Sequence, residues 1–268
     1  MKNIIYFIIT AVFVGCSGMG TITNKNKSEK HLLRIVSYNI RHGYGMDNKS
    51  DLSRIAKVIS NLNPDLVALQ EIDKGCKRTK GVDIAKELGK ILKMDYRFGK
   101  FRNYDGGEYG MAILSRLPIL ETKKHQLPKG KQPRCALEVK VKVNGLTKPL
   151  SFVGIHNDWG IEGKAQGFRE KQVKTLIKAL KSYNNPIVLA GDFNVIDGKE
   201  CESIKLLSND NWTVLQKKGQ RMTYPADDPK REVDFFILKG LDFSLIEHRV
   251  VEEKEASDHR PIYAVLKF

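Results

Sequence analysis

A stretch of alternating side chains near the middle of the chain places the strongest constraint on the fold. Within residues 137–143, Leu and Val alternate with Glu and Lys, and this period of two is typical of a strand with one buried face. Asn144-Gly145, a dipeptide favoured in hairpin turns, follows, and an apolar segment then runs to His156. We therefore expect an antiparallel hairpin, which argues against an all-parallel doubly wound sheet.

The rest of the chain mixes short apolar runs with segments of helical spacing. Strands are expected at 32–40, 65–71, 110–115, 186–194, 233–238 and 261–268, and helices near 51–62, 84–92 and 168–180. Hairpins combined with helix-separated strands indicate sheets that pack together and are covered by helices. The 268 residues contain no internal repeat, so we expect one large α/β domain over residues 32–268.

The first residues have the pattern of an export signal. One Lys precedes an apolar stretch that is too short for a bilayer core, and small residues come before Cys16. Gly15-Cys16 is similar to a bacterial lipoprotein box, in which the Cys becomes lipidated. We expect an export signal over residues 1–15 and a lipidated Cys16 with a polar tether over residues 16–31. The protein would then be a membrane-anchored lipoprotein, periplasmic or at the outer membrane, with ordinary secretion as the alternative.

The charge balance favours anionic partners. The chain has 46 Lys and Arg against 31 Asp and Glu, a formal net charge of +15 at pH 7. Nucleic acid, phospholipid head groups and soluble phosphate esters all fit this charge, and the scattered lysines do not choose among them. The other cysteines, Cys76, Cys135 and Cys201, show no paired spacing, so neither a disulfide framework nor a zinc site is expected.

Polar side chains able to bind metal or transfer protons fall within or at the ends of the expected strands. These residues are Asn39, Glu71, His156, Asp192, Asn194, Asp234, Asp258 and His259. An unpaired buried carboxylate is costly, so such groups are either satisfied locally or converge on one site.

Seven short motifs occur in the order seen in the endonuclease/exonuclease/phosphatase superfamily, and together they resemble that superfamily over residues 32–268. The motifs are YNIRHG (38–43), LQE (69–71), YGMAILSR (109–116), HND (156–158), GDFN (191–194), EVDFFIL (232–238) and SDHRP (257–261). The resemblance implies a DNase I-like, four-layer α/β sandwich with two packed mixed β-sheets flanked by helices. It also implies a divalent-metal-dependent hydrolase of phosphate esters.

The resemblance further implies where the metal binds. The expected cofactor is Mg²⁺, with Mn²⁺ or Ca²⁺ as alternatives, and hard cations of this kind take oxygen ligands. Glu71 is the main expected ligand, Asn39 contributes an amide oxygen directly or through water, and Asp258 adds a second carboxylate.

The resemblance also implies catalytic roles. His259 is expected to act as general base or as an imidazolium that stabilises the phosphate, with Asp234 on its other ring nitrogen. Asp192 is expected to be an acid/base and Asn194 a donor to the phosphoryl oxygen. His156 would hydrogen-bond the phosphate and protonate the leaving group. Whether Asp192 or His259 takes the proton from the attacking water stays open at this point.

Three functions are weighed on this basis. The first is a phosphodiesterase acting on a small or lipid-derived phosphate ester, working as a monomer. The alternatives are an extracytoplasmic DNase I-like nuclease and a non-catalytic lipoprotein that binds an anionic ligand. Arg41 stands where abasic-site enzymes of the family have an acidic residue, which weakens a repair-nuclease role. Arg134 is either a substrate contact or a solvated charge, and Trp159 either stacks on substrate or packs.

Overall fold

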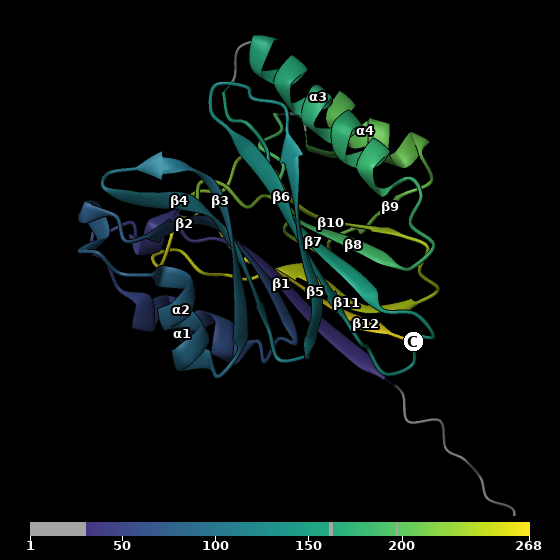
Figure 1. Cartoon of the computed structure of the whole chain (residues 1–268), viewed down its shortest axis with the longest axis horizontal. Helices are drawn as coiled ribbons and strands as arrows, with labels where there is room; N and C mark the ends of the chain where they lie inside the picture. The colour runs from purple at the N-terminus through teal and green to yellow at the C-terminus, as the bar shows by residue number, and fades with distance from the viewer. Residues whose placement is uncertain (1–30, 161–162, 197) are drawn as a thin grey trace, which may run out of the picture.

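Two six-stranded β-sheets pack face to face in the computed structural model, which describes residues 31–160, 163–196 and 198–268 (Figure 1). The predicted export signal, Cys16 and the tether up to residue 30 lie outside the described residues and stay predictions. None of the helices in the described ranges is long and apolar enough to cross a membrane.

Both sheets are mixed. The first has the order β11 (Ser244–Val250), β12 (Ile262–Lys267), β1 (Leu32–Asn39), β2 (Leu66–Lys74), β4 (Gly107–Ser115) and β3 (Asp95–Tyr104). The second has the order β5 (Ile119–Leu127), β6 (Arg134–Val141), β7 (Leu150–His156), β8 (Ile187–Asp192), β10 (Asp234–Lys239) and β9 (Thr213–Val214). The pairs β1–β2 and β7–β8 are parallel, and the other neighbouring pairs are antiparallel.

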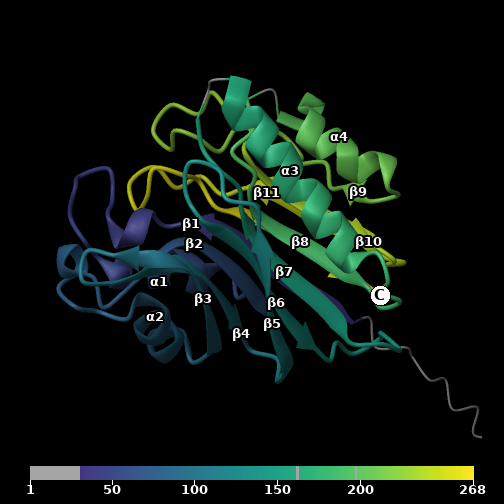
Figure 2. The ribbon, with the colours of Figure 1, turned by 45° about the horizontal axis from the view of Figure 1, so that its top comes forward.

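Helices cover the outer faces of the two sheets. In Figures 1 and 2, α1 (Leu52–Asn61) and α2 (Ile84–Leu92) lie on one side of the molecule, and α3 (Gly163–Leu180) and α4 (Glu202–Asn209) on the other. Short 3-10 turns are formed by η1 (Arg41–Gly43), η2 (Lys77–Thr79) and η3 (Gly198–Glu200). Asp51 and Asp83 cap α1 and α2 because their side chains accept backbone N–H groups of the first turn, at 3.0 and 3.2 Å.

Three apolar clusters hold these layers together. The central cluster joins the inner faces of the two sheets through buried side chains such as Ile35, Val139, Phe152 and Phe236. A second cluster lies between the first sheet and α1–α2, and a third lies between the second sheet and α3–α4. The expected four-layer α/β sandwich is therefore confirmed.

The predicted hairpin exists but has a longer connection than a two-residue turn. Strands β6 and β7 pair antiparallel, from Leu137 opposite Gly154 to Val141 opposite Leu150. Within the connecting loop, Leu146 N–H donates to the carbonyl of Val143 at 3.1 Å, and Gly145 has φ +89. Asn144-Gly145 thus turns the chain, as expected.

Strands β3, β5, β9 and β11 and helix α4 were not predicted. The edge strands β5 and β11 are mostly exposed or half-buried along their length, so their sequences lack an alternating apolar pattern. Strand β9 has only two residues and gives too short a pattern to detect. These omissions leave the central strands, which position the site, correctly predicted.

Gly191 allows a close approach between β7 and β8. In their parallel register, Ile155 lies opposite Gly191 and His156 opposite Asp192. A Cβ atom at position 191 would overlap the carbonyl oxygen of Ile155. The glycine of the GDFN motif therefore serves the strand pairing that sets His156 beside Asp192.

Replacing this glycine should loosen that pairing. We expect Gly191→Ala to lower the free energy of unfolding by ~1–3 kcal/mol, the usual cost of overpacking a core. Urea titration followed by circular dichroism measures it. The matched control is Gly167→Ala in α3, where a Cβ meets nothing within 4 Å and a gain of ~0.5–1 kcal/mol is expected. Equal stability of the two variants would contradict the overlap.

Candidate active site

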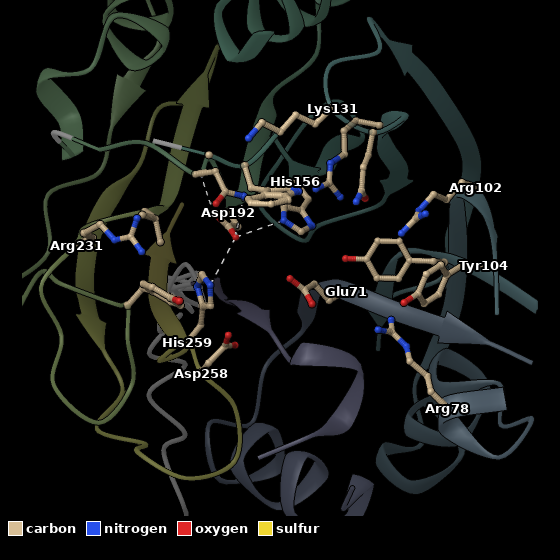
Figure 3. A pocket seen from close by; sticks show the side chains of 18 residues that line it. Glu71, Arg78, Arg102, Tyr104, Lys131, His156, Asp192, Arg231, Asp258 and His259 are labelled. Carbon is tan, nitrogen blue, oxygen red and sulfur yellow. Dashed lines mark hydrogen bonds and ion pairs between the residues drawn. The ribbon is translucent and has the colours of Figure 1, made fainter. Parts of the chain in front are cut away.

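A pocket of about 650 Å³ opens where strands of the two sheets end (Figure 3). Six of the eight predicted site residues line it, and the other two, Asn39 and Asp234, lie behind it and are 1% exposed. The lining residues among the eight are Glu71, His156, Asp192, Asn194, Asp258 and His259. The polar side chains named from the sequence therefore converge.

Glu71 reaches the pocket through a β-bulge. It was expected at the end of a strand, but it lies inside β2, where the pairing with β4 shifts between Gln70 and Ile72. Its φ is +60, an unusual value for a residue other than glycine. A bulge of this kind redirects a side chain without ending the strand. The Glu71 side chain is 28% exposed, and His42 Nδ1 lies 3.8 Å from its Oε2.

The environment of Glu71 keeps its carboxylate ionised. Burial alone would raise the pKa of Glu71, but its polar contact with His42 and the nearby charged ring of His259 lower the pKa to about 2. An ionised carboxylate facing an open pocket is suited to binding a cation.

Asn39 joins the two carboxylates of the pocket. Its amide nitrogen donates to Glu71 Oε1 at 3.3 Å and to Asp192 Oδ2 at 3.2 Å. Its Oδ1 accepts the backbone N–H of Arg41 at 3.1 Å. Because this N–H fixes the amide orientation, Asn39 turns its amide nitrogen toward the two carboxylates. Its Oδ1, the atom expected to bind the metal ion, accepts the N–H of Arg41 instead. Asn39 instead positions Glu71 and Asp192.

Asp258 is held close to the same part of the pocket by its neighbour. Ser257 Oγ donates to the carbonyl of Asn39 at 2.7 Å and lies 3.3 Å from Asp258 Oδ1, which ties this loop to the end of β1. Burial raises the pKa of Asp258, and the negative charge of Glu71 adds to the effect. A cation between Glu71 and Asp258 would relieve this repulsion.

His259 lies between two buried carboxylates. Its Nδ1 is 3.0 Å from Asp234 Oδ2, as predicted, and its Nε2 is 3.7 Å from Asp192 Oδ2. Burial alone would lower the pKa of His259, but Asp234 and Asp192 outweigh burial and raise the pKa well above its ordinary value. Burial also raises the pKa of Asp192, and the charge of Asp234 adds to it. The ring is therefore held as an imidazolium.

His156 has a different state. Its Nε2 lies 3.5 Å from Asp192 Oδ2, and its Nδ1 is buried without a hydrogen-bond partner among the described residues. Burial and the positive charge of Arg134 lower the pKa of His156 well below its ordinary value. His156 is thus a neutral imidazole beside a charged one.

Asn194 meets Asp192 through a turn that follows the end of β8. Strand β8 ends at Asp192, and Asn194 has φ +51. Its backbone N–H donates to Asp192 Oδ1 at 2.8 Å, and its amide donates to the carbonyl of Asn157 at 3.1 Å. The two side chains line the same pocket, as predicted.

Two sets of groups could hold a cation. Ligand atoms of Asp192, Asp234 and His259 lie within 4.8 Å of one another, and Glu71 and Asp258 are the two carboxylates of the predicted set, which also included Asn39. The imidazolium of His259 has no lone pair to give, since both ring nitrogens are directed at carboxylates. Hard cations prefer oxygen ligands, so the chemistry favours Glu71 and Asp258.

The sequence left two alternatives open for Arg134 and for Trp159. Arg134 is 2% exposed, lies 5.1 Å over the Phe101 ring, and has Nε and Nη1 without hydrogen-bond partners among the described residues. It lines the pocket and is buried, so it is not a solvated charge. Trp159 is 50% exposed at the same pocket and is not a core residue.

Lys217 supports Asp234 from behind. Its fully buried Nζ donates to Glu232 Oε1 and to the backbone carbonyl of Asp234, both at 2.8 Å. Asp234 in turn holds His259. No sequence signal separates Lys217 from the other basic residues, since its role depends on burial.

A model of the Endonuclease/Exonuclease/phosphatase family matches residues 36–259. The chain belongs to this family. Uncharacterized protein YbhP of Escherichia coli is 21% identical over 253 residues, which cover 89% of this chain and 98% of that protein. The resemblance seen in the seven motifs is thus confirmed at the level of the family.

Solved structures of family members share the fold. A Bacteroides thetaiotaomicron protein of this family has a TM-score of 0.73 at 18% identity, over 90% of this chain and 99% of that chain. A mannosyl-6-phosphatase of Bacteroides thetaiotaomicron has a TM-score of 0.69 at 19% identity, over 88% of this chain and 100% of that chain. The family fold is that of phosphoesterases, and the substrate of this member is a separate question.

The support that Lys217 gives to Asp234 can be measured by unfolding. Lys217→Met leaves Glu232 buried without its partner, so we expect a loss of ~3–5 kcal/mol in unfolding free energy. Adding Glu232→Leu removes the stranded charge and should recover most of that loss. Urea titration checks both variants, with Lys218→Met on the exposed neighbour as control, expected within ~0.5 kcal/mol of the parent. A single variant as stable as the parent would contradict the buried pair.

Proposed function

We propose that this chain is a divalent-metal-dependent phosphoesterase that hydrolyses phosphate esters, with phosphodiesters as the expected class. The observation that supports this proposal most is the convergence of Glu71 and Asp258 with the Asp234–His259–Asp192 chain and the unpaired Arg134 on one pocket. A water activated beside a phosphoryl group, with positive charge to receive the developing negative charge, is what such hydrolysis requires.

Glu71 and Asp258 would hold the metal ion. When bound there, the ion would supply Lewis-acid charge for the phosphoryl oxygens. Asn39 orients Glu71 through its amide N–H, so the carboxylate keeps one orientation toward the pocket.

Asp192 is the proposed general base. The amides of Asn39 and Asn194 donate to its Oδ2 at 3.2 and 3.3 Å, and the Nε2 atoms of His156 and His259 lie 3.5 and 3.7 Å from the same oxygen. Burial raises the pKa of Asp192 to about 7, and a base is most effective when its pKa lies near the working pH. His259 is already protonated between its two carboxylates, so it is better placed to stabilise negative charge than to accept a proton.

The remaining groups would bind the phosphoryl oxygens. Arg134 brings guanidinium N–H groups that no described residue occupies. Asn194 is fixed by its bonds to Asp192 and Asn157, and His156 by its place opposite Asp192. Donors held in this way need no reorganisation as charge develops.

Turnover tests the proposal directly. With Mg²⁺ we expect hydrolysis of bis-p-nitrophenyl phosphate, no hydrolysis with EDTA, and a fall of about 100- to 10,000-fold in Asp192→Asn, which removes the base. Asp228→Asn, on a side chain 71% exposed and away from the pocket, is the matched control. Parallel assays of p-nitrophenyl phosphate and plasmid DNA separate diesterase from monoesterase and nuclease. Turnover that persists in EDTA, or in Asp192→Asn, would overturn the proposal.

Metal titration tests which residues hold the ion. We expect Glu71→Gln to weaken Mn²⁺ binding in calorimetry by at least about 10-fold. A loss of this size is already typical when a residue that only hydrogen-bonds to a metal ligand is replaced, so loss of a direct ligand should cost at least as much. Glu252→Gln, on a side chain 76% exposed, is the matched control. If Asp234→Asn abolished binding and Glu71→Gln did not, the ion would belong to the Asp192, Asp234 and His259 set.

A further inference from the structure

One side of the pocket carries two guanidinium groups stacked on the same two aromatic rings. We call Arg78, Arg102, Tyr104 and Tyr109 the arginine wall. Arg78 lies 4.6 Å from the Tyr104 ring centroid and 5.6 Å from that of Tyr109. Arg102 lies 4.4 and 5.7 Å from the same two centroids. All four residues line the pocket.

The arginine wall stands apart from the proposed proton-transfer groups. In Figure 3, Arg78, Arg102 and Tyr104 lie on the opposite side of Glu71 from His259 and Asp258. The phosphoryl group under attack must lie near Asp192, so the wall faces another part of a bound substrate.

Arg78 is fixed in place before any ligand arrives. Its Nε and Nη2 donate to the two carboxylate oxygens of Asp73 at 2.7 and 2.8 Å, and the Asp73 side chain is fully buried. This bidentate pair leaves Nη1 without a hydrogen bond to any other described residue. The pairing with Asp73 therefore fixes the orientation of the Arg78 guanidinium and leaves the N–H groups of Nη1 free to donate to a ligand.

Arg102 has no such partner. No carboxylate of the described residues lies within 4.0 Å of its guanidinium, and its Nε is buried without a hydrogen bond. The wall thus holds two positive charges against one carboxylate, and Arg134, also unpaired, lines the same pocket. Unsatisfied donors and uncompensated positive charge at a pocket indicate an anionic ligand group.

We infer that the arginine wall binds a second anionic group of the substrate, separate from the phosphoryl group that is hydrolysed. This inference rests on the proposed phosphoesterase function and specifies its substrate class. The pocket volume of about 650 Å³ lies within the range of small-molecule sites. The substrate is therefore a small phosphate ester with a second phosphate or a carboxylate.

Direct binding of non-hydrolysable ligands tests the wall without relying on turnover. Calorimetry in saturating Mg²⁺ compares propylphosphonate, which has one anionic group, with propylene bisphosphonate and phosphonopropionate, which have two. We expect one or both two-anion ligands to bind the parent protein about 10- to 100-fold more tightly than propylphosphonate. The phosphonate and carboxylate arms show which second group the wall prefers. The readout is this ratio of affinities.

Arg102→Gln should reduce that ratio by about tenfold, because it removes the unpaired charge while leaving the Arg78–Asp73 pair intact. Arg97→Gln, on the same strand but outside the pocket, is the matched control and should keep the parent ratio. Arg102→Lys keeps the charge without the planar stack and should fall between them. Chelation of Mg²⁺ in solution is the same for every variant, so comparison among variants cancels it.

Four outcomes would overturn the inference. Equal binding of one-anion and two-anion ligands by the parent protein would exclude the second subsite, while hydrolysis of bis-p-nitrophenyl phosphate would leave the proposed function standing. If the affinity ratio fell in Arg97→Gln as much as in Arg102→Gln, the preference for two-anion ligands would come from the overall positive charge of the protein and not from the arginine wall. A ratio lost in Lys131→Gln and kept in Arg102→Gln would place the second subsite at Lys131, which also lines the pocket, and not at the arginine wall. Binding of no phosphonate, together with no turnover, would overturn the subsite and the proposed function at once.

Discussion

The site depends on the register of three neighbouring strands. In the second sheet, Asp192 of β8 lies opposite His156 of β7 on one side and opposite Asp234 of β10 on the other. A shift of one residue in either pairing would turn the side chains to the other face of the sheet. Gly191 permits the close contact between β7 and β8, so the backbone itself sets this row of three residues.

Such a row carries an electrostatic cost. Asp192 and Asp234 are each 1% exposed, and two buried carboxylates side by side repel each other. His259, delivered from the loop before β12 of the first sheet, lies between them and supplies the opposite charge. Asn39, at the end of β1, donates to Asp192. The buried carboxylates of the second sheet therefore depend on His259 and Asn39 from the first sheet. The packing of the two sheets brings these partners together and so stabilises the carboxylates.

The helices and central strands were predictable because their buried faces require apolar residues at a regular spacing along the sequence. Central strands such as β1 and β8 are buried on both faces and read as continuous apolar runs. The edge strands β5 and β11 have no such requirement, and they were missed. The convergence of acids and histidines was also predictable, because polar groups at the ends of buried strands require partners. The bulge at Glu71 was not, since a one-residue shift leaves the apolar pattern on both sides intact.

The residues that the sequence did not single out, or whose role it left open, are cations whose roles depend on what surrounds them. Lys217, Arg102 and Arg134 look alike in a chain with 46 Lys and Arg, yet one is a buried support and two line the pocket. Charge alone is uninformative where most basic side chains are solvated. What separates these three is the environment: a buried carboxylate for Lys217 and aromatic rings without a carboxylate for the two arginines.

This contrast bears on how selectivity arises in the fold. The groups proposed for proton transfer sit on or directly beside the paired central strands, where a change in backbone would disturb the core. The two arginines of the arginine wall come from η2 and from β3, the strand at the edge of the first sheet, which pairs with one neighbouring strand only. A shared reaction on the central strands and a variable wall at the edge would let related chains keep their chemistry while changing the substrate that reaches it.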